Sequence, residues 1–418
     1  MIKSKRLLAA GLAVSLVLAA CGDDDDDDAS GPVEDTTEAT DAADDTTATT
    51  EAEGDDMAED EGDDMAEDET PATTAAPDEG DDMVESDLTV GLTFDLLGRG
   101  DQSFNDSAAA GIDRAIADFG ISVNEVTPTD ASARGTDLQL QAENAGLVIG
   151  VGFSFASDLA SANDECEVSG VALENPDVPF AIVDDSMLNF CTDPPSPLAE
   201  NVAGLVFSEE QGSYLVGVAA ALKSTTGKVG FIGGVSGIGL IERFEAGFIA
   251  GAKSINPDIE VASAYITEFP DFAGFEDPAR AKEIADAMYS EGADIVYAAA
   301  GLSGSGMFQA AAEVSAATGT KVWGIGVDSD QYNTVDPAVQ EFVLTSMLKR
   351  VDVAVYEVTK SVVEGNFQPG EVRYDLAVDG VGYSTSGGFV DDIVDQLEAA
   401  KAAIVSGDVV VPNDPADA

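Results

Sequence analysis

The sequence contains no histidine among its 418 residues and only three cysteines. Without histidine, Ser-His-Asp catalysis, Cys-His catalysis and histidine-ligated zinc are excluded. Basic residues are also scarce, with 18 Lys and Arg against 81 Asp and Glu, which gives a formal net charge of -63. Because proteins neutralise phosphate groups with clustered Lys and Arg, this balance argues against nucleic acid and anionic substrates as partners.

Long hydrophobic runs are absent as well. The longest apolar stretch covers residues 7–20, and it is shorter than the roughly 20 residues that a membrane-spanning helix requires. Three basic residues precede this stretch and Cys21 follows it directly, which is typical of a secretory signal peptide that ends at a lipidation site. We therefore expect residues 1–20 to be a lipoprotein signal peptide and Cys21 to carry a lipid that anchors the mature protein to the outer face of the cell membrane. A plain secretory signal followed by a chance cysteine is the alternative.

Residues 21–86 have the composition of a disordered tether. Residues 22–86 contain 29 acidic residues and no basic residue, and the eight-residue unit EGDDMAED occurs twice before the variant EGDDMVES. Few large apolar side chains and many like charges indicate disorder, because burial cannot offset the entropy lost on ordering. Calcium binding is the alternative for so many carboxylates. The spacing lacks the glycine and the closing glutamate of an EF-hand loop, so no metal site is predicted.

Residues 87–418 are enough for two lobes, because a single core rarely serves so long a chain. Short apolar, β-branched runs alternate with segments of helical period throughout this region. Continuous apolar strands between helices predict an α/β fold with doubly wound parallel sheets that are buried on both faces. The expected strands are residues 88–95, 121–126, 147–153, 180–184, 202–207, 229–233, 259–266, 294–300, 321–327, 343–348 and 372–378. The expected helices are residues 107–119, 133–144, 209–222, 240–254, 277–290, 306–318, 351–364 and 390–406.

Polar and glycine-rich residues follow most of these strands. In parallel sheets a ligand lies beyond the carboxyl ends of the strands, so these residues predict a binding cleft between the lobes. Carboxylates that accept from hydroxyls, aromatic rings that stack and a few cations form the mixture that sugars and nucleosides require. The residues are Asp95, Phe104 and Asn105 within residues 103–106, Gly152, Phe153, Asp184, Asp185, residues 233–234, Phe244 within residues 242–244, Gly301 within residues 301–306, Asp328 within residues 328–330, Lys349 and Arg350.

Each of these features also has a simpler explanation. The glycine-rich turns at residues 233–239 and 301–306 lack the GxGxxG spacing of dinucleotide sites, and tight turns after strands account for them, so no cofactor is predicted. The paired acids after the strands are too close in the chain to flank a glycosidic bond from opposite sides. They suit helix capping or hydroxyl recognition better than acid–base catalysis. Phe104 and Phe244 are equally compatible with a place in the core, and Lys349 is equally compatible with a surface charge.

Cys166 and Cys191 are the two remaining cysteines. After export they would lie in a compartment where disulfides persist. A disulfide and two buried thiols both fit the sequence.

The folded region resembles the basic membrane protein family of lipoproteins, also called the purine nucleoside receptor family, whose members serve ABC-type importers. The resemblance covers about residues 88–382 and is carried by many stretches in the family's order. They include VGLTFDLLGRGDQSFNDSAAAG (residues 90–111), LVIGVGFSFA (147–156), FAIVDDSM (180–187), NVAGLVFSEEQGSYLVGVAAAL (201–222), AAAGLSGSG (298–306), WGIGVDSDQ (323–331) and LTSMLKRVDVAVY (344–356).

This resemblance implies the fold of the type I periplasmic binding proteins, in which two doubly wound lobes are joined by three crossovers and close on the ligand by a hinge. The crossovers then fall near Thr225, Lys349 and Pro369. The first lobe comprises residues 87–225 and 349–369, and the second comprises residues 226–348 and 370–418. The segments around the two cysteines look like additions to the family pattern and fit an extra disulfide-pinned loop.

The resemblance also implies which polar residues contact the ligand. Asp95 and Asp184 match two aspartates that contact the ligand in purine-nucleoside-binding relatives. Gly301, Asp328 and Lys349 match residues that hold the ribose. The chemistry suits these roles, because ribose hydroxyls donate to a carboxylate and accept from an ammonium in charge-assisted hydrogen bonds.

The aromatic residues are matched in the same way. Phe104, in the Ser-Phe-Asn stretch that includes Asn105, matches a phenylalanine that stacks on the base. Phe244 or Tyr297 would supply a second ring from the other lobe. Leu96 stands where some relatives have a polar residue, which leaves the base selectivity open.

Three functions are compatible with these features. The leading hypothesis is non-catalytic capture of a purine nucleoside or a similar small ligand, followed by docking of the closed protein on an ABC permease. A ligand sensor that feeds a membrane signalling receptor is the second hypothesis, and a nucleoside hydrolase is the third. The absence of histidine and the binding-protein pattern argue against an enzyme.

Overall fold

The structure is a computed structural model that describes residues 86–418. The expected signal peptide, the lipidation site at Cys21 and the expected tether, apart from its last residue, lie outside the described residues. Within residues 86–418, no helix is long and apolar enough to cross a membrane.

The first lobe is built on a six-stranded sheet in which every pairing is parallel, with the order β15-β9-β6-β3-β1-β2. Strands β3, β6 and β9 are buried along their whole length, as their continuous apolar sequences predict. Helices α1 and α9 pack against each other in this lobe. Its main elements are β1 (Thr89–Thr93), α1 (Phe104–Phe119), β2 (Ser122–Val126), α2 (Arg134–Ala142), β3 (Leu147–Gly150), β6 (Phe180–Val183), β9 (Val202–Phe207), α9 (Val351–Val363) and β15 (Gly370–Tyr374).

The second lobe is built on a six-stranded sheet with the order β11-β10-β12-β13-β14-β16. All pairings are parallel except that of β16, which is antiparallel to β14. Its main elements are α5 (Glu209–Lys223), β10 (Lys228–Ser236), α6 (Gly239–Ile255), β11 (Glu260–Glu268), α7 (Pro278–Ser290), β12 (Ile295–Ala299), α8 (Gly304–Thr318), β13 (Trp323–Asp328), β14 (Val343–Lys349), β16 (Val381–Tyr383) and α10 (Val394–Val405). The two sheets give the chain the two-lobed α/β architecture expected from its sequence.

Several helix ends follow signals that can be read in the sequence. Asp277 accepts a hydrogen bond from the backbone N–H of Arg280, and Pro278 occupies the first position of α7, where its missing N–H costs no hydrogen bond. Gly120 ends α1 in the left-handed conformation, with a φ of 64°. These residues fix where α7 begins and where α1 ends.

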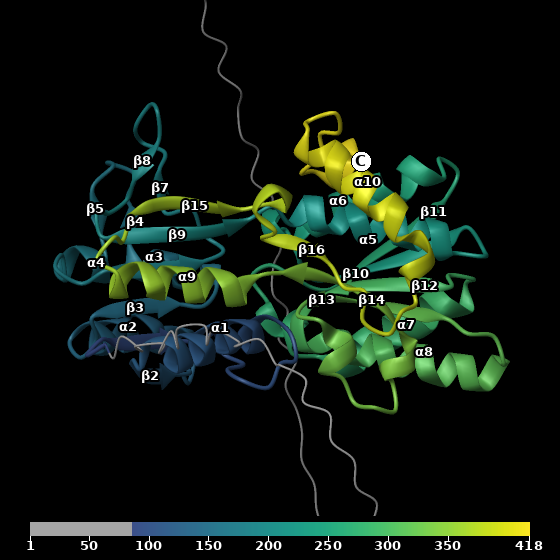
Figure 1. The fold of residues 1–418 in the computed structure, drawn as a ribbon, viewed down its shortest axis with the longest axis horizontal. Coiled ribbons are helices and arrows are strands. Elements are labelled where there is room, and N and C mark those ends of the chain that lie inside the picture. Colours follow the sequence, from purple (N-terminus) through teal and green to yellow (C-terminus); the bar gives the residue numbers. More distant parts are fainter. Residues whose placement is uncertain (1–85) are drawn as a thin grey trace, which may run out of the picture. The chain divides into compact units, whose positions relative to one another are not determined.

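The chain crosses between the lobes three times, but two of the expected positions are wrong. Helix α5 packs against α6, β14 and β16, so the first crossing lies at Ser208 and not near Thr225. Strand β15 pairs with β9 of the first sheet, so the third crossing follows Tyr374 and not Pro369. Figure 1 shows α5 beside α6 at the right and β15 beside β9 at the left. The second crossing joins β14 to α9. An apolar pattern indicates that a segment is buried, but it does not indicate which of the two sheets the segment pairs with or packs against.

The first lobe also carries two small hairpins. The hairpins pair β4 (Ser161–Ala162) with β5 (Val168–Ser169) and β7 (Leu188–Asn189) with β8 (Ser196–Pro197). Short helices α3 (Ala156–Leu159) and α4 (Val171–Glu174) lie in the same part of the chain. A disulfide joins Cys166 to Cys191, with their Cα atoms 5.8 Å apart. The disulfide therefore links one hairpin to the other.

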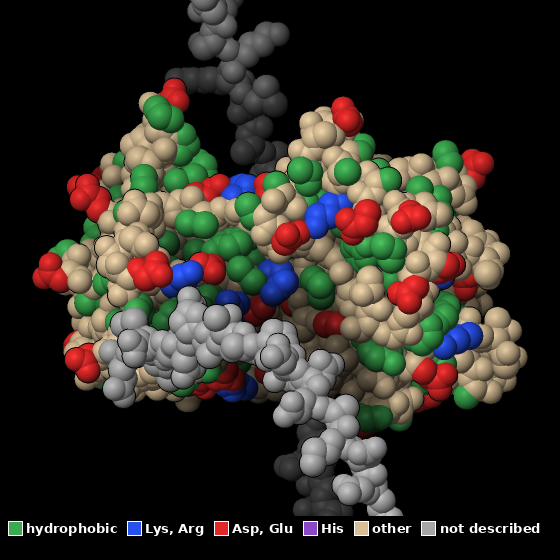
Figure 2. All heavy atoms as spheres, viewed as in Figure 1, with side chains coloured by type: hydrophobic (Ala, Val, Ile, Leu, Met, Phe, Trp, Pro, Cys, Tyr) green, Lys and Arg blue, Asp and Glu red, His purple; other side chains and the backbone are tan. Residues whose placement is uncertain are grey.

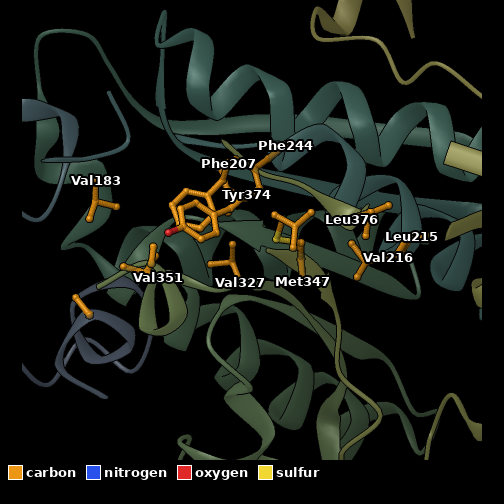
Figure 3. Close-up of a cluster of buried hydrophobic side chains, with 14 of the residues drawn as sticks. Val183, Phe207, Leu215, Val216, Phe244, Val327, Met347, Val351, Tyr374 and Leu376 are labelled. Carbon is orange, nitrogen blue, oxygen red and sulfur yellow. The ribbon is translucent and has the colours of Figure 1, made fainter. Parts of the chain in front are cut away.

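One hydrophobic cluster extends from the first lobe into the second. Figure 3 shows Phe207 from the first sheet near Val327 and Met347 from the second, and Val183 of the same cluster lies further to the left. The ring of Phe207 stacks on that of Tyr374, with 5.2 Å between the ring centroids. The crossings therefore run through a shared apolar junction.

The surface of the described region is acidic. Residues 87–418 contain most of the acidic residues of the chain, and Figure 2 shows acidic side chains spread over the visible face of both lobes. This distribution makes an anionic partner unfavourable over most of the visible surface.

Candidate functional site

The carboxyl ends of both sheets contribute to one cavity. Asp95, Gly152 and Asp184 follow three strands of the first sheet, and Gly301 follows β12. The cavity contains about 850 Å³ of empty space when the solvent in its open mouth is included. Its lining residues are Asp95, Leu96, Leu97, Asp101, Phe104, Arg134, Gly152, Phe153, Ser154, Asp184, Leu240, Ile241, Phe244, Phe272, Phe275, Glu276, Ala299, Gly301, Val327, Asp328 and Lys349.

Lys349 is buried at the end of β14 and is surrounded by carboxylates. Its Nζ atom lies 2.6 Å from Oδ1 and 2.8 Å from Oδ2 of Asp184, and 3.3 Å from Oε1 of Glu209. Burial opposes the charged ammonium, but the carboxylates of Asp184, Glu209 and Asp328 outweigh it and raise the pKa of Lys349 to about 12. Lys349 therefore remains a cation that connects the first lobe to the second.

Three aromatic rings complete the surroundings of this ammonium. The centroids of Phe207, Phe104 and Phe244 lie 5.1, 5.3 and 5.6 Å from Nζ of Lys349. These distances permit cation–π attraction, which is strongest where water is excluded. Phe104 and Phe244 line the cavity from opposite lobes.

Burial has the largest influence on the pKa values of the aspartates in the cavity. It raises the pKa of Asp328 to about 6 against the opposing effects of Lys349 and of the hydrogen bond from Ser103. It likewise raises the pKa of Asp95 to about 6, although Asn105 donates to that carboxylate. Burial also raises the pKa of Asp184 above its ordinary value, even beside Lys349. The cavity thus holds carboxylates in an environment where a ligand that donates hydrogen bonds can replace lost water.

Two of these aspartates have backbones in the left-handed region. Asp184 has a φ of 73° and Asp328 a φ of 63°, and they end comparable strands in the two sheets. A residue other than glycine adopts this conformation only when its surroundings hold it there, and such strain often coincides with functional sites. The strained positions coincide here with the cavity.

Asn105 is placed behind the cavity and does not line it. Its side chain is buried and donates to Oδ1 of Asp95 at 2.7 Å and to Oδ2 of Asp101 at 3.2 Å. Asp101 in turn accepts from the backbone N–H groups of Ser103, Asn105 and Asp106. Asn105 therefore positions the Asp95 carboxylate, while the loop that carries Phe104 is held by Asp101.

The lobes contact each other directly beside the cavity. Ser103 of the first lobe donates to Oδ2 of Asp328 at 2.6 Å, and Ser329 donates back to the carbonyl of Ser103 at 2.8 Å. The rings of Phe153 and Phe272, also from opposite lobes, have centroids 6.0 Å apart. The structure is therefore a closed arrangement of the lobes.

The cavity also contains residues that the sequence did not indicate. Phe272, Phe275 and Glu276 lie on the irregular segment after β11, and Arg134 begins α2. Glu209, which the sequence suggested only as an acid at a helix start, is fully buried and lies close to Lys349. Aromatic residues directly after a strand were the available signal for the β11 segment.

Tyr297 lies outside the cavity. It is fully buried in the core, and its hydroxyl lies 3.2 Å from that of Ser213. Of the two candidates for a second aromatic ring, only Phe244 lines the cavity. No cluster of three or more potential metal ligands occurs within residues 86–418.

Comparison with known proteins gives the family. The model of the family described as "ABC transporter substrate-binding protein PnrA-like" matches residues 89–415. The chain belongs to this family. The ABC transporter nucleoside-binding protein BmpA of Lactococcus lactis is 34% identical over 342 residues, covering 78% of this chain and 90% of that protein. The CD4+ T-cell-stimulating antigen of Listeria monocytogenes is 35% identical over 347 residues, covering 79% of this chain and 89% of its own length.

A solved structure gives the same result for the fold. An ABC transporter solute-binding protein from Aeropyrum pernix matches with a TM-score of 0.64 and 29% sequence identity, covering 78% of this chain and 94% of that chain. This PnrA-like chain therefore has the periplasmic-binding-protein fold and is an ABC transporter substrate-binding protein. Membership in this class implies a small-molecule ligand and a permease as partner.

Proposed function

We propose that the protein captures a purine nucleoside between its lobes and delivers it, without converting it, to the permease of an ABC importer. The observation that carries this proposal is one cavity that combines the rings of Phe104 and Phe244 with the carboxylates of Asp95 and Asp328 and the ammonium of Lys349. Flat aromatic faces stack on a base, and carboxylates with an ammonium suit the hydroxyls of a ribose.

The sugar subsite is proposed at Asp328 and Lys349. Oδ2 of Asp328 accepts from Ser103, and among the described residues Oδ1 has no hydrogen-bond partner, so it can accept from a ribose hydroxyl. Gly301 lines the same region with a φ of 55°, a conformation in which a side chain would be strained. A ligand can therefore approach the backbone closely at this position.

The charge of the cavity supports a neutral ligand. Acidic residues outnumber basic ones in its lining, where Arg134 and Lys349 are the cations, and Lys349 is already surrounded by two carboxylates. The acidic residues are Asp95, Asp101, Asp184, Glu276 and Asp328. A phosphate group would be repelled by these acids. A nucleoside fits this balance better than a nucleotide, and the nucleoside-binding relative from Lactococcus lactis supports the same ligand class.

Calorimetry tests the ligand class. Guanosine and inosine are expected to bind with one ligand per chain, and ribose much more weakly because it offers no ring to stack. Asp328→Asn is expected to weaken nucleoside binding about 10- to 100-fold, since a hydrogen bond to a charged group contributes roughly 1.5 to 3 kcal/mol.

Asp330→Asn is the matched control, because Asp330 lies two residues away, accepts from Ser384 and Ser386, and does not line the cavity. Its affinity for nucleosides is expected to equal that of the unchanged protein. Absence of binding by every nucleoside would overturn the proposed ligand.

We also propose that a lipid on Cys21 holds the protein at the outer face of the cell membrane. The support is the sequence alone, in which a short apolar run with small residues ends directly before Cys21. The unchanged protein is expected in the membrane fraction. Cys21→Ser is expected either as a soluble protein or as a precursor that keeps its signal peptide. A Cys21→Ser protein that stays mature and membrane-bound would contradict the anchor.

A further inference from the structure

We propose that Arg134 selects the base of the ligand, so that the cavity prefers 6-oxopurine nucleosides, such as guanosine and inosine, to the 6-aminopurine nucleoside adenosine. This inference rests on the proposed nucleoside function and assigns a specificity-determining residue within the same cavity. Arg134 is the second cation of the cavity lining, after Lys349.

The two cations of the cavity are in different situations. Lys349 lies within 3.3 Å of carboxylate oxygens on both Asp184 and Glu209. Within residues 86–418, Arg134 forms no ion pair, and its buried Nε has no hydrogen-bond partner. A buried donor without an acceptor is unfavourable, and among the described residues no carboxylate compensates the charge that Arg134 brings to the cavity.

Arg134 lies beside an aromatic ring of the first lobe. It begins α2, and its guanidinium carbon lies 5.8 Å from the ring centroid of Phe155. Phe155 follows Gly152 and Phe153, which line the cavity after β3. The guanidinium therefore lies beside the segment whose Phe153 meets Phe272 of the other lobe.

The acidic residues of the cavity lining restrict what this guanidinium can bind. Asp95, Asp101 and Glu276 line the same cavity and would repel a carboxylate or phosphate. The acceptor must therefore be neutral. A guanidinium presents a planar fork of donors that matches two adjacent acceptors.

A 6-oxopurine presents that pair of acceptors. Its O6 and N7 atoms both accept hydrogen bonds, whereas adenine presents N7 beside an amino group that donates. The carboxylate of Asp95 adds to the selection. It accepts hydrogen bonds, which suits the N1–H donor of a 6-oxopurine and opposes the unprotonated N1 of adenine. Arg134, which donates hydrogen bonds, and Asp95, which accepts them, thus favour the same class of base.

Calorimetry on Arg134→Met, Arg134→Lys and the unchanged protein tests this assignment. The unchanged protein is expected to bind guanosine and inosine about tenfold or more tightly than adenosine, the discrimination typical of a bidentate arginine contact. Arg134→Met is expected to lose that factor for guanosine and inosine and to leave adenosine within about twofold. Arg134→Lys keeps the charge without the fork and is expected to lose most of the preference.

Arg114→Met is the matched control, because Arg114 lies on α1, over the ring of Tyr356 and outside the cavity lining. It is expected to keep the full preference. Equal affinities of the unchanged protein for inosine and adenosine, or an equal loss for both in Arg134→Met, would overturn the role of Arg134 while leaving nucleoside binding intact. Failure of every nucleoside to bind would overturn the proposed function and this inference with it.

Discussion

Lys349 is the residue at which both lobes and the cavity meet. It ends β14 of the second sheet, contacts Asp184 from the first lobe, and lies close to Glu209 at the start of α5. Removing one partner of a buried charge pair leaves the other charge uncompensated, which is costly. The ammonium is therefore part of both the closed structure and the candidate site.

The buried aspartates predict opposite effects of pH on stability and on binding. The pKa values of Asp95 and Asp328 are raised to about 6 by burial, above their values in the unfolded chain, so the folded protein binds more protons between about pH 4 and 7. Their contribution to stability is lost as pH rises through 6 and regained as pH falls. Ligand-free protein is expected to melt a few degrees higher at pH 5.5 than at pH 7.5.

Nucleoside binding should change in the other direction, because ribose hydroxyls and the base need ionised carboxylates as acceptors. The rise in melting temperature caused by inosine is expected to be smaller at pH 5.5 than at pH 7.5, measured by differential scanning fluorimetry. In Asp328→Asn the ligand-free melting temperature should depend less on pH. An inosine-induced rise that is as large at pH 5.5 would contradict the assignment of these carboxylates.

The sequence could predict which residues line the cavity wherever the signal was local. Asp95, Asp184, Gly301, Asp328 and Lys349 lie at or just beyond strand ends, Phe104 begins α1, and all of them line the cavity. Lys349 lies close to Glu209, although the two residues are 140 positions apart in the sequence. Neither hydrophobic periodicity nor a turn motif can predict such a contact. The Ser-Phe-Asn stretch predicts Asn105 as a ligand contact, whereas its buried side chain donates to Asp95 from behind the cavity.

Helices α5 and α6 show how elements place the site. A Cβ on Gly217 would overlap the carbonyl of Phe248, and one on Gly251 would overlap the carbonyl of Tyr214. The two helix backbones therefore approach each other closely. Because α5 carries Glu209 and α6 carries Phe244, this packing holds both residues near Lys349.

Gly251→Ala is expected to destabilise the protein, because the added methyl group would force α5 and α6 apart. A loss of about 1 to 3 kcal/mol in the free energy of unfolding is expected from such overpacking, measured by urea denaturation. Gly239→Ala is the control, since a Cβ on Gly239 at the start of α6 would meet no atom within 4 Å. Equal stability of the two variants would contradict the close packing of the helices.

The positions of strands and helices could be predicted from the sequence more reliably than the elements with which they pair or pack. The apolar run at residues 202–207 is β9, as expected, because continuous burial leaves a continuous apolar pattern. The expected strand at residues 372–378 ends at Tyr374, and Asp375 then caps a short turn with its side chain. Strand β16, with three residues, is too short to leave a pattern.

At the scale of the whole molecule, the lobes are closed upon each other. Ser103 and Asp328 are hydrogen-bonded across the lobes beside the cavity, and the cluster that contains Phe207 and Met347 continues from one lobe into the other. The same carboxylate of Asp328 that contacts Ser103 also lines the cavity. The proposed ligand contact and the contact between the lobes thus share one residue, which is the arrangement expected of a protein that closes on its ligand.

Capture of a nucleoside without conversion is the function proposed for this protein. The most direct measurement incubates the protein with inosine, removes unbound ligand by rapid desalting, denatures the protein and quantifies inosine and free base by chromatography. We expect about one intact inosine per chain and no free base. Recovery of no inosine from a correctly folded protein, or release of free base, would contradict the claim.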